Sequence, residues 1–139
     1  FGKKDGVCQE FYDNGNLKYE RNYLNDEIEG YALNYSEGGQ KLKEGNYING
    51  KKNGLWKTYY ENGEKESKKY YKDDNLNGES KEWYKTGQKK FEGEYLLGKG
   101  INTHTKWHYN GKISETIKYR KNGTIAKLKK WNENGQKIN

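Results

Sequence analysis

Glycine recurs in this chain at a fixed interval of 24 residues, and this spacing constrains the possible folds more than any other feature. A second glycine series has the same interval and lapses at Asn102 and Ala126. A fixed period of this length indicates a repeat architecture, in which each unit packs on its neighbours. The two series are Gly15, Gly39, Gly63, Gly87, Gly111 and Gly135, and Gly6, Gly30, Gly54 and Gly78.

Two aromatic series follow the same interval. Only 29% of the 139 residues are hydrophobic, whereas 34% are charged, so the chain has too few aliphatic side chains to fill a thick core. Aromatic residues, however, make up 15% of the chain. Aromatic rings remove large apolar areas from water, and a tyrosine hydroxyl can stay hydrated. We therefore expect the rings to stack into ladders that supply the core: Phe11, Tyr35, Tyr59, Trp83, Trp107 and Trp131, and Tyr23, Tyr47, Tyr71, Tyr95 and Tyr119.

Each repeat has the pattern of a β-hairpin. A short aromatic segment such as 56–60 is followed by an Asn-Gly turn, a longer strand such as 16–23, and a Gly/Asn-rich link such as 49–54. Asn-Gly tolerates positive φ and is the strongest short hairpin signal. Glycine recurs too often for helices. The sequence predicts an all-β, single-layer antiparallel solenoid of stacked β-hairpins, one per 24-residue repeat.

The repeats divide the chain into one domain, 1–139. We expect residues 1–5 to be the tail of a preceding repeat, so that further repeats or a leader lie upstream. The predicted repeats are 6–29, 30–53, 54–77, 78–101, 102–125 and a partial unit, 126–139.

These residues resemble the MORN repeat. The unit Gly-x-x-x-x-aromatic-aromatic-x-Asn-Gly, followed by a Tyr and an Asn-Gly-Lys-x-x-Gly link, is most similar to the bacterial variant found in exported and antitoxin-like proteins. The resemblance implies a hairpin solenoid that serves as a scaffold or binding surface without a catalytic motif. The chain departs from the pattern after residue 98, where His108 and Asn132 stand in place of the tyrosines of other copies.

Catalytic, metal-binding and cofactor-binding residues are not predicted. The single cysteine, Cys8, excludes an internal disulfide and a cysteine-based zinc cluster. It lies about four repeats from His104 and His108, too far for a Cys-His pair. Even spacing in one strand places the two histidines on one face, roughly 13 Å apart, which is too far for one metal ion. We expect His108 to replace a ring of the ladder and Cys8 to be a packing residue.

Aromatic residues that occur in only some copies are the better candidates for a carbohydrate- or choline-type site. The rings present in every repeat are expected to form the core instead. The candidate surface aromatics are Tyr12, Trp56, Tyr60, Tyr70 and Tyr84.

The net charge of +7 falls entirely on residues 103–139, since residues 1–102 have equal numbers of basic and acidic side chains. This basic end either binds an anionic partner or protects a sheet edge with lysines. Nucleic acid is disfavoured because Arg21 and Arg120 are the only arginines. The candidate anion-binding residues are Lys106, Lys112, Lys118, Arg120, Lys121, Lys127, Lys129 and Lys130.

Together these features predict a non-enzymatic repeat scaffold that binds a protein or a host or cell-surface component. We expect it to be exported (secreted, periplasmic or at the cell surface), with a cytoplasmic location as the alternative. Two other functions stay open: binding of anionic lipid or another polyanion by the basic end, and neutralisation of a toxin in the cytoplasm. A transmembrane segment is not expected, because no run of about 20 apolar residues occurs.

Overall fold

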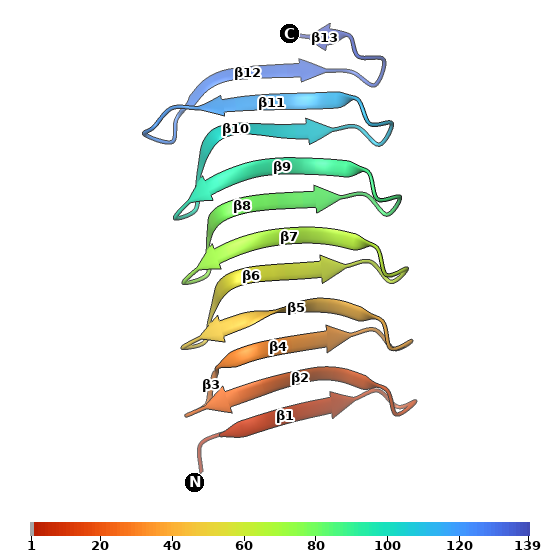
Figure 1. The fold of residues 1–139 in the computed structure, drawn as a ribbon, viewed down its shortest axis with the longest axis vertical. Coiled ribbons are helices and arrows are strands. Elements are labelled where there is room, and N and C mark those ends of the chain that lie inside the picture. Colours follow the sequence, from red (N-terminus) through yellow and green to blue (C-terminus); the bar gives the residue numbers. More distant parts are fainter. Residues whose placement is uncertain (1) are drawn as a thin grey trace.

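The computed structural model describes residues 2–139, which form a single open antiparallel sheet (Figure 1). The sheet has 13 strands, and these residues contain no helix. The predicted fold class is therefore confirmed. Each strand pairs with its neighbour in sequence, so the order runs from β1 to β13, with the short β3 pairing only with β2. Every repeat is consequently held by the repeats directly before and after it.

The strands are mostly six to nine residues long. They are β1 (Gly6–Phe11), β2 (Leu17–Leu24), β3 (Glu27–Ile28), β4 (Gly30–Tyr35), β5 (Lys41–Ile48), β6 (Lys51–Tyr59), β7 (Lys65–Lys72), β8 (Asn75–Trp83), β9 (Lys89–Leu96), β10 (Lys99–Trp107), β11 (Ile113–Tyr119), β12 (Ile125–Trp131) and β13 (Lys137–Ile138).

The predicted Asn-Gly turns connect neighbouring strands at one end of the strands. In the first of them, the amide of Tyr12 donates to the carbonyl of Asn16, and the amide of Gly15 donates to the carbonyl of Tyr12. Gly15 has φ of 87°, whereas Asn14 stays at negative φ. The turn is therefore a longer loop with one left-handed glycine, and not the two-residue turn that Asn-Gly commonly forms. The five corresponding loops have the same pair of backbone hydrogen bonds.

The Gly/Asn-rich links connect the strands at their opposite end and are themselves tight turns. Asn25-Asp26, Asn49-Gly50, Asp73-Asp74 and Leu97-Gly98 all have positive φ at both residues. Two consecutive positive φ values are the signature of the type I′ hairpin turn. The sheet is thus a continuous meander, in which the links pair strands as closely as the Asn-Gly turns do.

The end of the chain departs from this pattern. Asn102 keeps the positive φ (60°) of the glycines that it replaces, so the lapse at this position does not change the backbone. The link between β11 and β12 does change. It is a longer loop of the Asn-Gly kind, with Gly123 at φ of 84° and its amide bonded to the carbonyl of Arg120. The regular alternation of turns therefore stops within the basic end, at the link between β11 and β12.

Burial is concentrated at one repeat position. Ala32, Trp56, Ser80 and His104 are 24 residues apart and are each at most 4% exposed. They point to the same side of the sheet, which we call the Trp56 face. The opposite side, which holds Tyr31, Glu44 and Tyr59, is called the Tyr59 face. The tyrosine series packs on the buried position, with the Tyr47 ring centroid 4.9 Å from Trp56.

A second period of 48 residues underlies this burial. Large rings at Trp56 and His104 alternate with small residues at Ala32 and Ser80. Each large ring lies against a glycine of the preceding strand: a Cβ on Gly45 would overlap the Trp56 indole, and one on Gly93 would lie 2.7 Å from the His104 ring. The structural unit is therefore a pair of repeats, with one ring seated on one glycine.

The turns follow the same 48-residue period. The side-chain amides of Asn14, Asn62 and Asn110 donate to backbone carbonyls in the next repeat, at Glu37, Lys85 and Glu133 respectively. The intervening turns have Gly38 and Thr86 at this position. Two kinds of contact thus join the repeats: hydrogen bonds between neighbouring turns, and contacts of rings with glycines within the sheet.

One prediction about the core is wrong. The series that contains Phe11 and Tyr59 lies on the Tyr59 face, where Phe11 is 55% exposed and the later members are half-buried. Its rings do not stack on one another within residues 2–139; instead, the Lys65 ammonium lies 5.9 Å from the Trp83 ring and that of Lys89 lies 5.6 Å from the Trp107 ring. The second series, with Tyr47 and Tyr95, does belong to the core.

The ring-on-glycine contact gives a direct test of this core. Gly45→Ala should lower the free energy of unfolding by about 1–3 kcal/mol, because the new methyl group overlaps Trp56. Gly38→Ala is the control, since its φ is not positive and its closest contact is 3.8 Å; it should change stability by less than about 0.5 kcal/mol. Urea unfolding measures both.

A double-mutant cycle identifies the cause. In a Trp56→Ala background, Gly45→Ala should cost much less than in the wild type, because the clashing ring is gone. An equal cost in both backgrounds would show that the glycine is needed for another reason.

Candidate binding face

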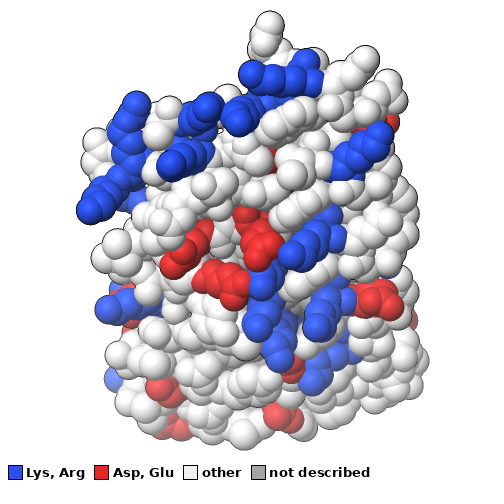
Figure 2. Space-filling model, turned by 45° about the horizontal axis from the view of Figure 1, so that its top comes forward, with Lys and Arg blue, Asp and Glu red and all other residues white. Residues whose placement is uncertain are grey.

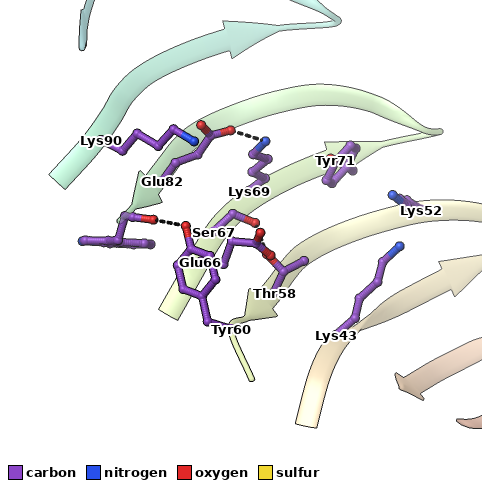
Figure 3. A pocket seen from close by; sticks show the side chains of 11 residues that line it. Lys43, Lys52, Thr58, Tyr60, Glu66, Ser67, Lys69, Tyr71, Glu82 and Lys90 are labelled. Carbon is purple, nitrogen blue, oxygen red and sulfur yellow. Dashed lines mark hydrogen bonds and ion pairs between the residues drawn. The ribbon is translucent and has the colours of Figure 1, made fainter. Parts of the chain in front are cut away.

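A hollow of about 300 Å³ opens on the Trp56 face over β5 to β9 (Figure 3). Strand alternation directs side chains of β6 and β7 such as Thr58 and Ser67 to this face. Two tyrosines also line the hollow, so hydroxyl groups add polar atoms. Four lysines line it together with two glutamates. These six charged residues are Lys43, Lys52, Lys69, Lys90, Glu66 and Glu82.

Two of the lysines converge on a buried indole at one end of the hollow. The ammonium groups of Lys43 and Lys52 lie 5.2 and 5.1 Å from the Trp56 ring, and Lys52 is also 5.0 Å from the ring of Tyr71. Burial lowers the pKa of Lys43, and the neighbouring charges of Lys52 and Arg21 lower it further. This end is therefore a crowded cationic site on an aromatic floor: the Trp56 indole lies beneath the two lysines and does not itself line the hollow.

The other end of the hollow is balanced in charge. Lys69 forms an ion pair of 2.6 Å with Glu82, and the hydroxyls of Thr58 and Ser67 are 2.6 Å apart (Figure 3). The hollow thus presents cations, acceptors and hydroxyl groups within one open surface. Such a mixture suits a partner with several polar groups more than an apolar ligand.

The tyrosines predicted as surface aromatics are half-buried and joined to the backbone of the following repeat. The hydroxyls of Tyr12, Tyr60 and Tyr84 donate to the carbonyls of Tyr35, Trp83 and Trp107 at 2.7–2.8 Å. These three tyrosines therefore have a structural role in joining repeats. The remaining candidate, Tyr70, is half-buried on the Tyr59 face, so the set does not form one site.

His108 replaces a tyrosine in this ladder, because its Nε2 lies 2.8 Å from the carbonyl of Trp131. The structure also corrects the prediction for Trp56. It is 4% exposed and its Nε1 donates to the carbonyl of Asn46, so it is a core residue and the prediction of a surface ring is wrong. Gly45 on the adjacent strand makes room for the indole, as Gly93 does for the His104 ring at the same repeat position.

A buried carboxylate lies on the Tyr59 face of the same strands. Glu44 is 8% exposed and accepts hydrogen bonds from the hydroxyls of Tyr31 and Tyr59 and from the Lys41 ammonium, all at 2.7–2.8 Å. Burial raises the pKa of Glu44, but these three donors outweigh it and hold the pKa at about 2. Burial and the same hydrogen bonds raise the pKa values of both tyrosines to about 12.

This cluster makes stability depend on pH. The folded pKa of Glu44 is below its ordinary value of 4.5, so its contribution is complete above pH 4.5 and is lost as the pH falls towards 2. The loss amounts to about 3 kcal/mol. Glu44→Gln should lower stability at pH 7 by about 2 kcal/mol and flatten the acid slope.

Chemical denaturation at pH 2.5 to 7 measures this effect. Glu61→Gln is the control, since Glu61 is an exposed turn residue outside the cluster. An unchanged acid slope in Glu44→Gln would exclude Glu44 as its source.

Lys and Arg side chains gather at the C-terminal end of the sheet (Figure 2), but the strand register divides the residues of the basic end between the two faces. On the Trp56 face, Lys106 and Lys130 flank Glu115 at 3.0 and 3.6 Å. On the Tyr59 face, Lys118, Lys127 and Lys129 occupy adjacent positions of β11 and β12. The residues in the turns are Lys112, Arg120 and Lys121.

The turn residues of the basic end are partly engaged. The Lys112 ammonium donates to the carbonyl of Asn134 at 3.1 Å, and Arg120 donates to the carbonyl of Ile125 at 2.5 Å. None of Lys118, Lys127 and Lys129 takes part in an ion pair within residues 2–139. These three form a cluster on one face that is available to an anion, and Lys121 in the turn also has no ion pair among the described residues.

The histidines and the cysteine are not brought together. His104 lies in the core with its Nε2 2.7 Å from the carbonyl of Glu94, while His108 bonds in a different repeat. Cys8 is a half-buried free thiol in β1. Across the part of the chain that the structure describes, no three His, Cys, Asp or Glu residues are grouped to hold a metal ion.

Sequence reasoning missed the cations of the hollow. Lys43, Lys52 and Lys69 lie in a region of zero net charge, so composition gave no reason to single them out. Strand alternation could have found them, since it places all three on the side of Trp56. These lysines could therefore have been recognised from the face that they share, and not from the net charge of the region.

Comparison with known families agrees with the repeat structure. The family described as the MORN repeat variant matches residues 4–25, 52–73 and 76–96. No curated protein matches the chain. None of the described residues belongs to a helix long and apolar enough to cross a membrane.

Proposed function

This chain is a MORN-variant repeat protein, and from that premise we propose that it is a non-catalytic binding and scaffold module that holds a protein partner against its Trp56 face. The partner is a protein or a host or cell-surface component. The observation that carries the proposal is the hollow over β5 to β9, where unpaired lysines and half-buried rings face solvent.

The rest of the sheet supports a scaffold role. Each repeat is joined to the next by a strand ladder, by tyrosine hydroxyl bonds such as that from Tyr60 to Trp83, and by turn bonds such as that from Asn62 to Lys85. These bonds fix the spacing of neighbouring repeats, so side chains on one face keep their relative positions. Preorganisation of this kind lowers the entropic cost of binding an extended partner.

Site-specific photo-crosslinking tests the proposed face. A benzophenone amino acid placed at Thr58, which lines the hollow, should crosslink the partner in cells that produce the protein. The same group at Lys57, the adjacent residue on the opposite face, should give no adduct. Adducts from Lys57 alone would contradict the proposal, and the adduct is identified by mass spectrometry.

A second candidate function is anion binding at the basic end. It is favoured by one observation: Lys118, Lys127 and Lys129 lie side by side on β11 and β12 without an ion-pair partner among the described residues. Anionic lipid head groups or another polyanion would meet these three charges, each contributing about 1 kcal/mol near a charged membrane. Protection of the terminal strands against edge pairing is the alternative role.

Heparin chromatography and liposome sedimentation test this function. Replacing Lys118, Lys127 and Lys129 by Ala should markedly lower the salt concentration of elution from heparin and abolish sedimentation with anionic liposomes. Replacing Lys106 and Lys130, which share Glu115, should have a much smaller effect. Equal retention of the wild type and the triple variant would exclude polyanion binding at this surface.

We also propose that the protein is exported. The resemblance to exported repeat proteins supports secretion, the periplasm or the cell surface. Neutralisation of a toxin in the cytoplasm is the alternative, and it uses the same binding face.

A further inference from the structure

We infer that the hollow on the Trp56 face takes an acidic peptide segment of the partner, with Asp or Glu carboxylates seated between Lys43 and Lys52 above the Trp56 indole. This inference rests on the proposed function and adds the chemistry of the partner. Four observations carry it: unpaired cations, their crowding, the aromatic floor, and the length of the hollow.

The cations at this end have no carboxylate of their own. Lys43, Lys52 and Arg21 take part in no ion pair within the described residues. Other lysines on the same face are paired, such as Lys69 with Glu82 at 2.6 Å and Lys106 with Glu115 at 3.0 Å. Lys90 at the other end of the hollow has no ion pair among the described residues either, but it stands alone, whereas Lys43 and Lys52 lie over the same ring.

The crowding of these cations favours an added anion. Lys43 is partly desolvated and close enough to Lys52 for their charges to oppose each other, with Arg21 adding to the repulsion. A carboxylate between the two ammonium groups replaces repulsion by two charge-assisted hydrogen bonds. Binding energy is thus available here without any rearrangement of the sheet.

The indole keeps the ammonium groups in place. Trp56 is 4% exposed and is fixed by a hydrogen bond from Nε1 to the carbonyl of Asn46. Both lysine ammonium groups lie within cation–π distance of its ring. Two flexible side chains are therefore already held over one rigid ring, so they lose less conformational entropy when a carboxylate binds.

The length of the hollow favours a peptide over a small anion. Its lysines come from β5, β6, β7 and β9, and four strand spacings of about 4.8 Å give about 19 Å. An extended peptide covers this distance with about six residues. Glu66 and Glu82 in the same hollow can accept peptide N–H groups. They repel any anion, but they repel a doubly charged phosphate more than a singly charged carboxylate that is seated at the Lys43 and Lys52 end. Spaced single charges fit this pattern better than one concentrated charge.

Peptide binding to the whole chain tests the inference. The probe is a fluorescein-labelled eight-residue peptide with alternating Glu and Ser, and fluorescence anisotropy measures its dissociation constant. We expect saturable binding that weakens as salt is added. A version with Gln in place of Glu should bind at least tenfold more weakly.

Two matched double variants localise the binding. Lys43→Met with Lys52→Met should weaken binding at least tenfold, while Lys43→Arg with Lys52→Arg retains it. Lys57→Met with Lys68→Met removes the same charge from two directly paired residues on the opposite face and should leave binding unchanged. Circular dichroism melting checks that each variant is folded.

Three results would overturn the inference. They are equal weakening by the two methionine pairs, tighter binding of the Gln peptide than of the Glu peptide, and at least tenfold tighter binding of the same peptide with phosphoserine. Crosslinking of the partner from Thr58 together with no binding of the acidic peptide would reject the inference and leave the proposed function standing. Absence of crosslinks from Thr58 would instead count against the proposed function.

Discussion

The contact of a large ring with a glycine on the adjacent strand is the interaction on which this single-layer sheet depends. No second layer covers either face of the described residues, so the sheet must bury apolar area within its own surface. Trp56 over Gly45 and His104 over Gly93 do so by bringing a ring directly onto backbone. The small residues Ala32 and Ser80 fill the alternate positions, which makes two repeats the unit of packing.

The sequence predicted the fold class because the hairpin signals are local. Glycines every 24 residues mark the turns, and the tyrosine series with Tyr47 marks one element of the core. It did not reveal which rings are buried, since Phe11 and Trp56 are both large aromatic residues. Whether such a ring is buried depends on whether the neighbouring strand has a glycine that leaves room for it. Gly45 and Gly93 belong to neither 24-residue glycine series, and the structure shows that they lie under rings.

The candidate binding surface shows the same limit. Charge counting pointed to the C-terminal end, and the structure places those lysines together there but on both faces. The cations around Trp56 were hidden because acidic residues elsewhere in the first 102 positions cancel them in the sum. Net charge follows from composition, whereas a local excess of charge follows from strand register. The hollow on the Trp56 face combines that excess with a rigid floor provided by the core.

Amide hydrogen exchange of the free protein tests the two-repeat packing unit most directly. If rings on glycines organise the sheet, protection should have two maxima, one in β5 and β6 around Gly45 and Trp56, and one in β9 and β10 around Gly93 and His104, with weaker protection in β1, β2, β12 and β13. Equal protection in every repeat, or maxima in β1 and β4 around Phe11 and Tyr35, would contradict this account.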